Sequence, residues 1–445
     1  MKHFYAEKRI FVWIVVISIL AFLSTNYIYK NGYNGPPIRS DGKGYYVYLP
    51  SFFIDHSFQI QTDEYTPYWY VLENGNVVNS YPMGTAILQL PFFLAAHAYT
   101  LFYHPASADG WSEAYQIGNI VSAVVYYAAG IFFLYQILKR YFSSKISLAS
   151  CILISIGTNL FNYLTHDASF SHIYSFSVLI VFLYHLITYE EDKKDFFRGG
   201  GIRKTLNLMV FGVLAGIIFL IRNTNIIYVL LYVFYGVHSV AAFKKRFFEI
   251  IKPANSLPIF FAGMVTILPQ LIYWKKVTGQ FLFVSYQGTG LFDWFRPHIF
   301  NVLFSVRKGA LFWCPLLIFA IWGIWIQNEK LVKIRTASII FFLLNLYIIS
   351  SWYCWPYGGS LGQRPFIDSY GLLAVYLANF LEMFFSKTKC GKYHIAVQIA
   401  AGLLLFVLIV WNLCITWGYW VHLIPYDEAT LDTLRQFIIH LRGLL

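Results

Sequence analysis

The apolar stretch "IFVWIVVISILAFLSTNYI", residues 10–28, decides the class of this chain. It carries no charged residue, and a helix needs about 20 apolar residues to cross a bilayer. It is too long for a cleaved secretory signal, it lacks a small-residue cleavage site, and more such stretches follow it. We therefore expect a retained membrane helix and an all-α polytopic membrane protein.

The composition supports this class. Of the 445 residues, 58% are hydrophobic and only 12% are charged. The formal net charge of +12 would suggest nucleic acid as a partner of a soluble protein, but here we interpret the basic residues as topology signals and expect no nucleic acid. The five cysteines are scattered without metal-ligand spacing, so we expect no disulfide framework.

The apolar periodicity predicts eleven spans within a membrane domain of residues 1–417. They lie near residues 10–28, 113–138, 146–164, 168–189, 205–221, 225–241, 257–274, 309–327, 336–351, 368–385 and 395–417. A further apolar segment, "MGTAILQLPFFLAAHAYTLF" (83–102), also has the length of a span, but it contains Gln89, Pro91 and His97.

Lysine and arginine placement decides how segment 83–102 is interpreted. If it does not cross, the N-terminus and the loops near 139–145, 190–204, 242–252, 328–335 and 386–392 share one side and hold 21 of the 33 Lys and Arg residues. If it crosses, the N-terminal cluster faces the opposite side from the other loops. The positive-inside rule favours the first arrangement. Segment 83–102 is then an interfacial or re-entrant helix.

This topology predicts an inside N-terminus and a long first outer loop, residues 29–112, with interfacial helices. The C-terminal tail, residues 418–445, lies outside as well. Within it, "DEATLDTLRQFIIHLRGLL" (427–445) has the pattern of an amphipathic helix at the membrane surface.

Unusual polar residues then gather on the outer side. They are Asp41, Lys43, Asp55, Asp63, Glu64, His166, Asp167, Arg222, Lys275, Lys276, Arg307, Lys308 and Arg364. Several have ordinary explanations: Lys275 and Lys276 could be snorkelling side chains, Arg222 could bond helix ends, and His166 could be a packed polar residue. Asp41 and Arg364 are harder to explain in this way, since both lie beside glycines and aromatic residues. A carboxylate with several cations at one membrane face is typical of a site for a lipid-linked phosphate, in which the cations bind the phosphate and the carboxylate takes part in the reaction.

The order of motifs along the chain resembles that of the GT-C superfamily of polyprenyl-phosphate-sugar-dependent glycosyltransferases, which includes protein O-mannosyltransferases and aminoarabinose transferases. "SDGKGYYVYLPSFF" (40–53) is similar to the acidic motif after the first span, and "SYPMGTAILQLPFF" (80–93), which contains Tyr81, to the Pro-containing interfacial segment. "THDASFSH" (165–172) and "FLIRNTN" (219–225) resemble the second outer loop and a later helix end. "LPQLIYWKKVTGQFLFVSY" (268–286), "SVRKGALFWCPLL" (305–317) and "GGSLGQRPFID" (358–368) resemble later spans and the arginine loop.

The resemblance covers roughly residues 8–417. The acidic motif has one acid where several members have an Asp-Glu pair, and there is no large soluble C-terminal domain of the kind found in oligosaccharyltransferases.

The resemblance implies a hexosyl or pentosyl transferase that takes a sugar from a polyprenyl-phosphate donor. The acceptor is a glycan, lipid or protein. We expect a bacterial inner-membrane protein with its active site on the periplasmic face.

The resemblance and the chemistry of the residues together predict the roles at the site. Asp41 is the expected general base of an inverting transfer, and Asp167 and His166 are the other catalytic candidates. The expected donor-binding residues are Arg364, Arg222, Lys276, Lys275, Arg307, Lys308, Tyr45 and Tyr81. No cofactor is required, although a divalent metal bridging Asp41 and Asp167 stays open. Two alternatives also stay open: a lipid-linked glycan ligase or polymerase, and a lipid-sugar transporter.

Overall fold

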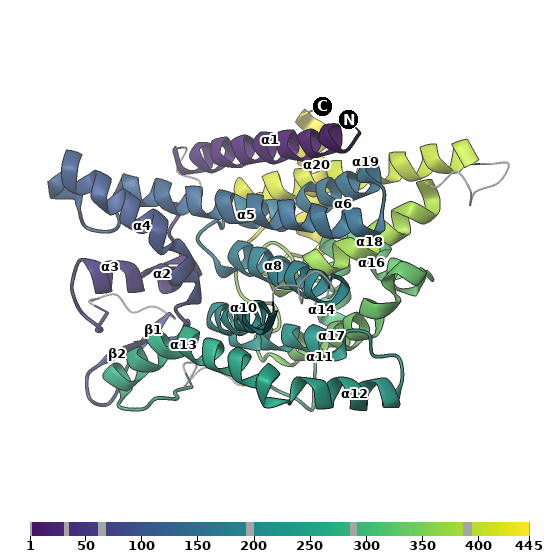
Figure 1. The fold of residues 1–445 in the computed structure, drawn as a ribbon. Helices are drawn as coiled ribbons and strands as arrows, with labels where there is room; N and C mark the ends of the chain where they lie inside the picture. The colour runs from purple at the N-terminus through teal and green to yellow at the C-terminus, as the bar shows by residue number, and fades with distance from the viewer. Residues whose placement is uncertain are drawn as a thin grey trace. The chain divides into compact units, whose positions relative to one another are not determined.

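The computed structural model describes residues 2–30, 35–60, 68–192, 200–284, 292–385 and 394–444, and it is mostly helical (Figure 1). Asp63 and Glu64 lie outside the described residues. The chain forms two compact units. The first unit comprises Met1–Asn34, Ala128–His166 and Leu291–Leu445, and the second comprises Gly35–Tyr127 and Asp167–Gly290.

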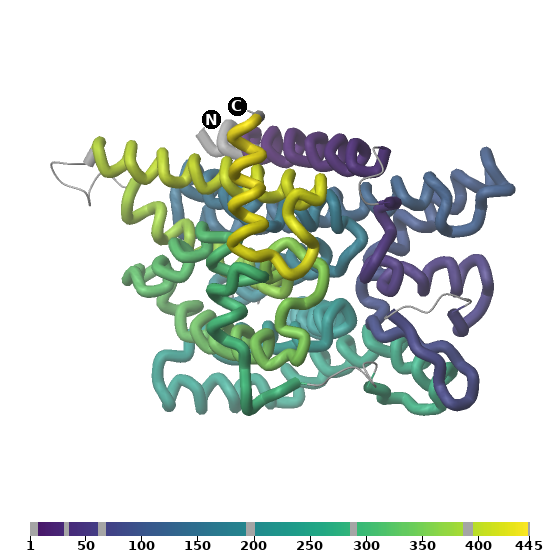
Figure 2. The backbone as a smooth tube through the Cα atoms, turned by 180° about the vertical axis from the view of Figure 1, so that it is seen from behind, coloured from purple at the N-terminus to yellow at the C-terminus, as the bar shows by residue number. Residues whose placement is uncertain are grey.

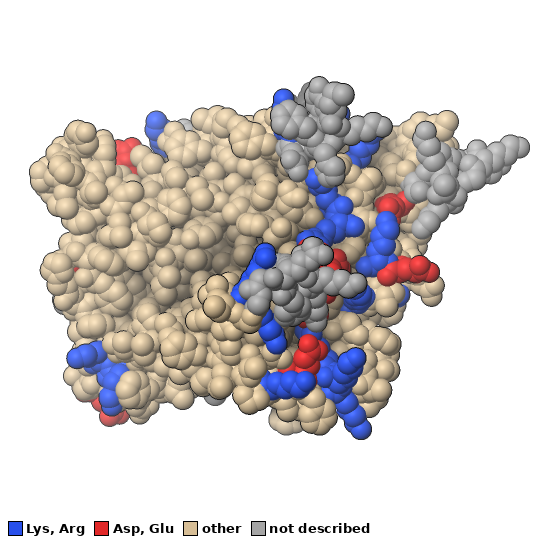
Figure 3. All heavy atoms as spheres, in the orientation of Figure 1, with Lys and Arg blue, Asp and Glu red and all other residues tan. Residues whose placement is uncertain are grey.

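Eight of the described helices are long and apolar enough to cross a membrane. They are Lys8–Lys30, Gly84–Tyr103, Glu113–Tyr141, Ser171–Glu191, Gly201–Ile221, Pro253–Thr278, Glu329–Ser351 and Ile395–Trp420. Three apolar helices are shorter: Ser144–Ile156, Asn223–Phe234 and Leu316–Trp325. Charged side chains are sparse over most of the face shown in Figure 3, as expected for helices that face lipid.

The second unit begins with two short helices and a hairpin, and longer helices follow. Its elements are α2 (Asp41–Tyr46), α3 (Tyr48–Phe53), β1 (Trp69–Val71), β2 (Val77–Asn79), α4 (Gly84–Tyr103), η1 (Pro105–Ser107), the start of α5 (Glu113–Tyr141), α8 (Ser171–Glu191), α10 (Gly200–Ile221), η3 (Asn223–Val229), α11 (Leu230–Phe234), α12 (Val240–Ile250) and α13 (Pro253–Thr278). β1 and β2 form an antiparallel hairpin in which Tyr70 pairs with Val78.

Glycines let α10 and α13 pack closely. A β-carbon at Gly212 would lie 2.1 Å from the carbonyl oxygen of Ile259, and one at Gly216 would lie 2.7 Å from the side chain of Thr266. Small residues four positions apart are a common basis of helix packing in membranes, where close backbone approach replaces the hydrophobic driving force. At the end of α10, Gly84 of α4 contacts the backbone of Leu220 and Ile221 in the same way.

The first unit is built around α18, whose residues from Tyr370 to Leu381 are all buried. The elements of this unit are α1 (Lys2–Lys30), the end of α5, α6 (Ser144–Ile156), α7 (Leu160–Leu164), α14 (Ile299–Phe304), α15 (Ala310–Trp313), α16 (Leu316–Trp325), η4 (Glu329–Leu331), α17 (Val332–Ser351), η5 (Arg364–Ser369), α18 (Tyr370–Phe385), α19 (His394–Trp420) and α20 (Leu431–Leu444). Gly323 of α16 packs directly on α18, because a β-carbon there would lie 1.9 Å from the carbonyl oxygen of Tyr376.

The helix expected in the C-terminal tail is confirmed as α20 (Leu431–Leu444), and Figure 2 shows it crossing α19. On the buried side of α20, Leu434 and Phe437 pack in a core cluster with Ile415 and Tyr419 of α19. Leu431 and Ile439 are exposed on another side. The tail helix therefore packs part of its apolar surface on protein.

Three spans expected as single helices are broken in the structure. The helix expected over 146–164 ends at Ile156, with Gly157 as its C-cap, and resumes as α7. The one expected over 309–327 is interrupted before Pro315, whose ring is incompatible with a continuous helix. The one expected over 225–241 begins as the 3₁₀ helix η3 and ends at Phe234, just before Gly236, whose φ is 72°. Hydropathy located these three apolar segments correctly, but a glycine or proline within each one ends the helix early.

Candidate functional site

Asp41 is the first residue of α2 and is half-buried. Its position depends on the two glycines that follow. A β-carbon at Gly42 would lie 1.9 Å from the hydroxyl oxygen of Ser169, and one at Gly44 would lie 2.4 Å from the ring of Tyr81. The sequence "DGKG" is therefore required because α2 is pressed against two neighbouring segments.

The loop that precedes α8 brings a second acid to the same part of the second unit. The carboxylate of Asp167 forms an ion pair with Arg39, from which it accepts a hydrogen bond at 3.3 Å, and the Asp167 side chain is only 5% exposed. Ser169 donates a hydrogen bond to the carbonyl oxygen of Pro37 at 2.9 Å. These contacts join residues 37–42 to residues 167–169, so the two acids expected at the site lie on segments that touch.

Arg222, at the end of α10, contacts the first turn of α8. Its guanidinium lies 3.3 Å from Nδ1 of His172. Because arginine can only donate, Nδ1 of His172 is the acceptor, and the proton of the neutral ring is on Nε2. Asn225, three residues further on, donates to the hydroxyl of Ser175 at 2.7 Å and holds this chain segment against α8. The second unit thus brings Arg39 to the loop that carries Asp167 and Arg222 to the first turn of α8, which follows that loop.

Two tyrosines that follow Asp41 closely, Tyr45 and Tyr48, are packed inside the protein. Tyr45 is buried; its ring centroid lies 4.4 Å from that of Tyr81, and its hydroxyl accepts a hydrogen bond from Ser171 at 3.1 Å. Tyr48 is buried as well and donates to the carbonyl oxygen of Tyr81 at 2.5 Å. Tyr81 is half-buried, so it is the more accessible of the two tyrosines expected to bind the donor.

Arg39 and His172 contact the predicted site residues Asp167 and Arg222, and the sequence analysis did not name them as candidates. Arg39 lies two residues before Asp41, and His172 ends the quoted motif "THDASFSH", so both were adjacent to residues that were chosen. Their contacts join residues 128 and 50 positions apart in the sequence, which no local pattern indicates.

Arg364 belongs to the first unit and begins η5, with Pro365 after it. Gly362 before it has a φ of 62°, and a β-carbon there would lie 3.1 Å from the side chain of Trp313. The backbone N–H of Arg364 donates to the carbonyl oxygen of Gly362 at 3.1 Å. This tight turn leaves the Arg364 side chain half-buried at the start of the helix.

The two cations before α15 hold the C-terminal tail. Arg307 forms a bidentate ion pair with Asp427, with both nitrogen–oxygen distances at 2.9 Å. Lys308 is buried and donates to the carbonyl oxygens of Ser360 and Tyr426. These contacts give both cations a structural role, and their expected role in donor binding stays a prediction.

The ion pair shifts the pKa values of both Asp427 and Arg307. Burial raises the pKa of Asp427, but the hydrogen bonds from Arg307 and from the backbone N–H of Glu428, with the charges of Lys308 and Arg307, outweigh it and hold that pKa below its usual value. The hydrogen bond to Asp427 in turn raises the pKa of Arg307.

The remaining predicted residues are distributed over both units. His166 is buried in the first unit, where its ring centroid lies 5.4 Å from that of Tyr419. The next residue, Asp167, belongs to the second unit. Lys275 and Lys276 are exposed at the end of α13, where Lys275 donates to the carbonyl oxygen of Gly279 at 2.6 Å. That bond is an ordinary helix-end contact.

A metal bridging Asp41 and Asp167 would need further protein ligands to complete a three-residue site. No group of three or more His, Cys, Asp or Glu side chains that could hold a metal ion occurs in the described part of the chain. Two carboxylates alone neither require nor exclude a divalent ion.

Comparison with known proteins gives one informative result. No protein-family profile and no curated protein matches the sequence. Among solved structures, the chain is similar to the archaeal oligosaccharyltransferase AglB from Archaeoglobus fulgidus, in complex with an inhibitory peptide and a dolichol-phosphate, with a TM-score of 0.51 and 11% identity. The match covers 94% of this chain and 56% of that one.

The chain therefore has a fold similar to that of this oligosaccharyltransferase. This chain spans a little over half the length of the oligosaccharyltransferase that it resembles. Identity of 11% shows the fold alone, so the activity must be argued from the residues of this chain. Together with the eight long apolar helices, the fold identifies an integral membrane protein.

Proposed function

We propose that this chain is a membrane glycosyltransferase that takes a sugar from a lipid-phosphate donor, with Asp41 as the general base. The observation that supports the proposal is the contact of Gly42, next to Asp41, with Ser169 of the loop that carries Asp167. Arg39 pairs with Asp167, and Arg222 contacts His172 just after that loop. A carboxylate with two arginines nearby suits a reaction that removes a proton and releases a phosphate.

The proposed reaction is a direct displacement at the anomeric carbon. The acceptor oxygen forms the new bond as the bond from the anomeric carbon to the phosphate oxygen breaks, and the acceptor proton passes to the Asp41 carboxylate. The configuration at the anomeric carbon inverts. The lipid phosphate leaves as an anion and needs little protonation, so one base is enough, and cations stabilise the developing charge.

Asp41 is preferred to Asp167 as the base because their surroundings differ. Asp167 is almost fully buried and its carboxylate is already bonded to Arg39. It therefore suits a positioning role, in which it orients Arg39. Asp41 is half-buried at the start of a helix and is the more accessible carboxylate.

Arg364 is the proposed phosphate ligand, because its planar guanidinium can bond two phosphate oxygens at once. Arg222 is the second candidate, since it contacts His172 in the first turn of α8, five residues after Asp167. Tyr81 is proposed to contact the sugar or the isoprenyl chain. We further propose that the site faces the periplasm of a bacterial inner membrane and that the acceptor is a glycan, lipid or protein.

The proposal is tested by donor consumption. The purified full-length protein is incubated with a panel of radiolabelled polyprenyl-phosphate sugars, with and without EDTA, and release of the lipid phosphate is followed. Transfer predicts release with at least one donor. A ligase or polymerase would consume only lipid-linked glycans, whereas a transporter would move a donor across a proteoliposome membrane without breaking the sugar–phosphate bond; either result would overturn the proposal.

A further inference from the structure

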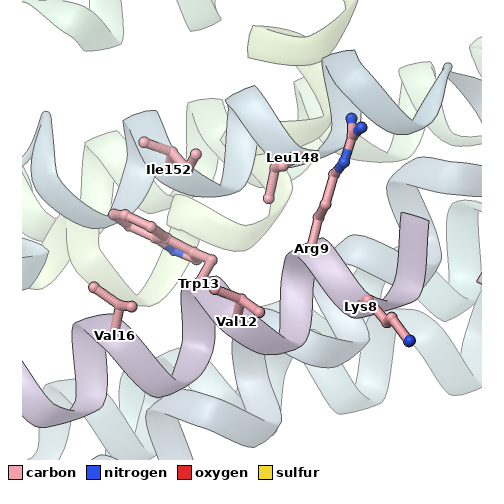
Figure 4. A pocket seen from close by; sticks show the side chains of 7 residues that line it. All are labelled: Lys8, Arg9, Val12, Trp13, Val16, Leu148 and Ile152. Atoms are coloured by element: carbon pink, nitrogen blue, oxygen red, sulfur yellow. The ribbon is translucent and has the colours of Figure 1, made fainter. Parts of the chain in front are cut away.

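A groove runs between α1 and α6 within the first unit, and it contains none of the residues proposed for glycosyl transfer. Its volume is about 420 Å³. The residues that line it are Lys8, Arg9, Val12, Trp13 and Val16 of α1 and Leu148 and Ile152 of α6 (Figure 4). Apart from Lys8 and Arg9, these are apolar.

One end of the groove is cationic. Figure 4 shows Arg9 reaching from α1 toward α6 beside Leu148, while Lys8 points away from α6. Lys145 is exposed one helical turn before Leu148 and therefore lies on the same face of α6, toward the end of the helix at which Arg9 lies. Positive charge at this end therefore comes from both helices.

The cationic end also marks a membrane boundary. Lys8 and Arg9 are the last charged residues before an uncharged stretch that continues to Tyr29. Only 22% of the most apolar window of α1 is buried within the protein, so most of this helix faces lipid. The groove consequently opens to hydrocarbon rather than to water, and an acyl chain is the natural filling for it.

We propose that this groove binds an anionic phospholipid of the bilayer. Its acyl chain would lie along Trp13, Val16 and Ile152, and its headgroup phosphate would contact Arg9 and Lys145. Basic pockets between membrane helices favour anionic headgroups, because each cation near the surface adds attraction that a zwitterionic headgroup does not match. The proposal does not depend on the proposed transferase activity.

Native mass spectrometry of the full-length protein tests this. The protein is purified in detergent and offered equal amounts of phosphatidylglycerol and phosphatidylcholine with the same acyl chains. We expect the wild type to retain phosphatidylglycerol preferentially and the double variant Arg9→Gln/Lys145→Gln to lose at least about fivefold of that preference. The matched control is Lys333→Gln, because Lys333 is an exposed cation of the same unit away from the groove.

A second variant tests the groove itself. Leu148→Trp fills the space and should lower retention of both lipids, while the thermal unfolding temperature, measured without added lipid, shows whether the variant has folded. The proposal is overturned if the wild type shows no preference, if Lys333→Gln loses as much as the double variant, or if folded Leu148→Trp retains lipid like the wild type.

Discussion

A β-carbon on Gly42 would lie 1.9 Å from the hydroxyl oxygen of Ser169, closer than two such atoms can approach. The same hydroxyl donates to the carbonyl oxygen of Pro37. The contact therefore sets the distance between the start of α2, which carries Asp41, and the loop that carries Asp167.

Replacement of Gly42 tests this contact. We expect Gly42→Ala to lower activity strongly, because the methyl group pushes α2 away from the 167–169 loop. Ser169→Gly removes the opposing atoms, so the double variant Gly42→Ala/Ser169→Gly should recover much of the lost activity. Donor turnover of the two single variants and the double variant is compared. Failure of the double variant to recover any activity would show that the loss has another cause.

Asp41→Asn tests the general base. The variant keeps the shape of the side chain but cannot accept a proton, so it should bind donor and transfer it at least about a hundredfold more slowly. Asp55→Asn is the control, since Asp55 is an exposed acid of the same loop. Equal, near-native turnover of both variants would remove Asp41 from the chemistry and leave it a role at the start of α2.

Arg364 is tested by two substitutions. Arg364→Ala should greatly weaken donor use, and Arg364→Lys should restore only part of it, because a point charge keeps the attraction but loses the bidentate geometry. The KM for the donor and kcat are measured separately. A fully active Lys variant would mean that Arg364 contributes charge alone.

The ion pair between Arg307 and Asp427 predicts an acid-sensitive tail. The pKa of Asp427 is lowered in the folded protein, so the pair's contribution to stability is complete above the ordinary aspartate pKa of about 3.9 and is lost as the pH falls through the lowered pKa. Because both side chains are 36% exposed, the effect on the free energy of unfolding should be at most about 1 kcal/mol.

Thermal unfolding of wild type and Asp427→Asn measures this contribution. The difference between the two should disappear in the acid range, because the neutral asparagine has no charge to lose there. Donor binding separates the two roles of Arg307: if it only holds the tail, Arg307→Gln and Asp427→Asn should behave alike. A loss of donor affinity confined to Arg307→Gln would assign Arg307 to the phosphate instead.

The topology of segment 83–102 is tested by labelling. The structure makes α4 a continuous helix of 20 residues with Pro91 inside it, which is long enough to cross. Lysine and arginine placement nevertheless predicts that it does not. Cysteines at the exposed positions Asn74 and Ser107, in a cysteine-free background, should both react with an impermeant reagent added from outside. Reaction at one of them alone would mean that α4 crosses the membrane.

Much of the fold followed from local patterns. The apolar stretches predicted a helical membrane protein, and the tail pattern predicted α20. The breaks at Gly157, Pro315 and Gly236 were visible as residue types, but hydropathy averaged over a span does not register them. The exact number of spans stays a prediction.

The sequence by itself determined the membrane class, the positions of the apolar helices and the residue types available for chemistry, because hydropathy and side-chain chemistry are read from neighbours along the chain. Only the tertiary structure decided which charges meet. Arg39 pairs with Asp167 across 128 positions, and Arg307 with Asp427 across 120. Such pairs depend on how distant helices pack, and the small residues that allow that packing, such as Gly42 and Gly212, show their purpose only when the opposing atoms are in place.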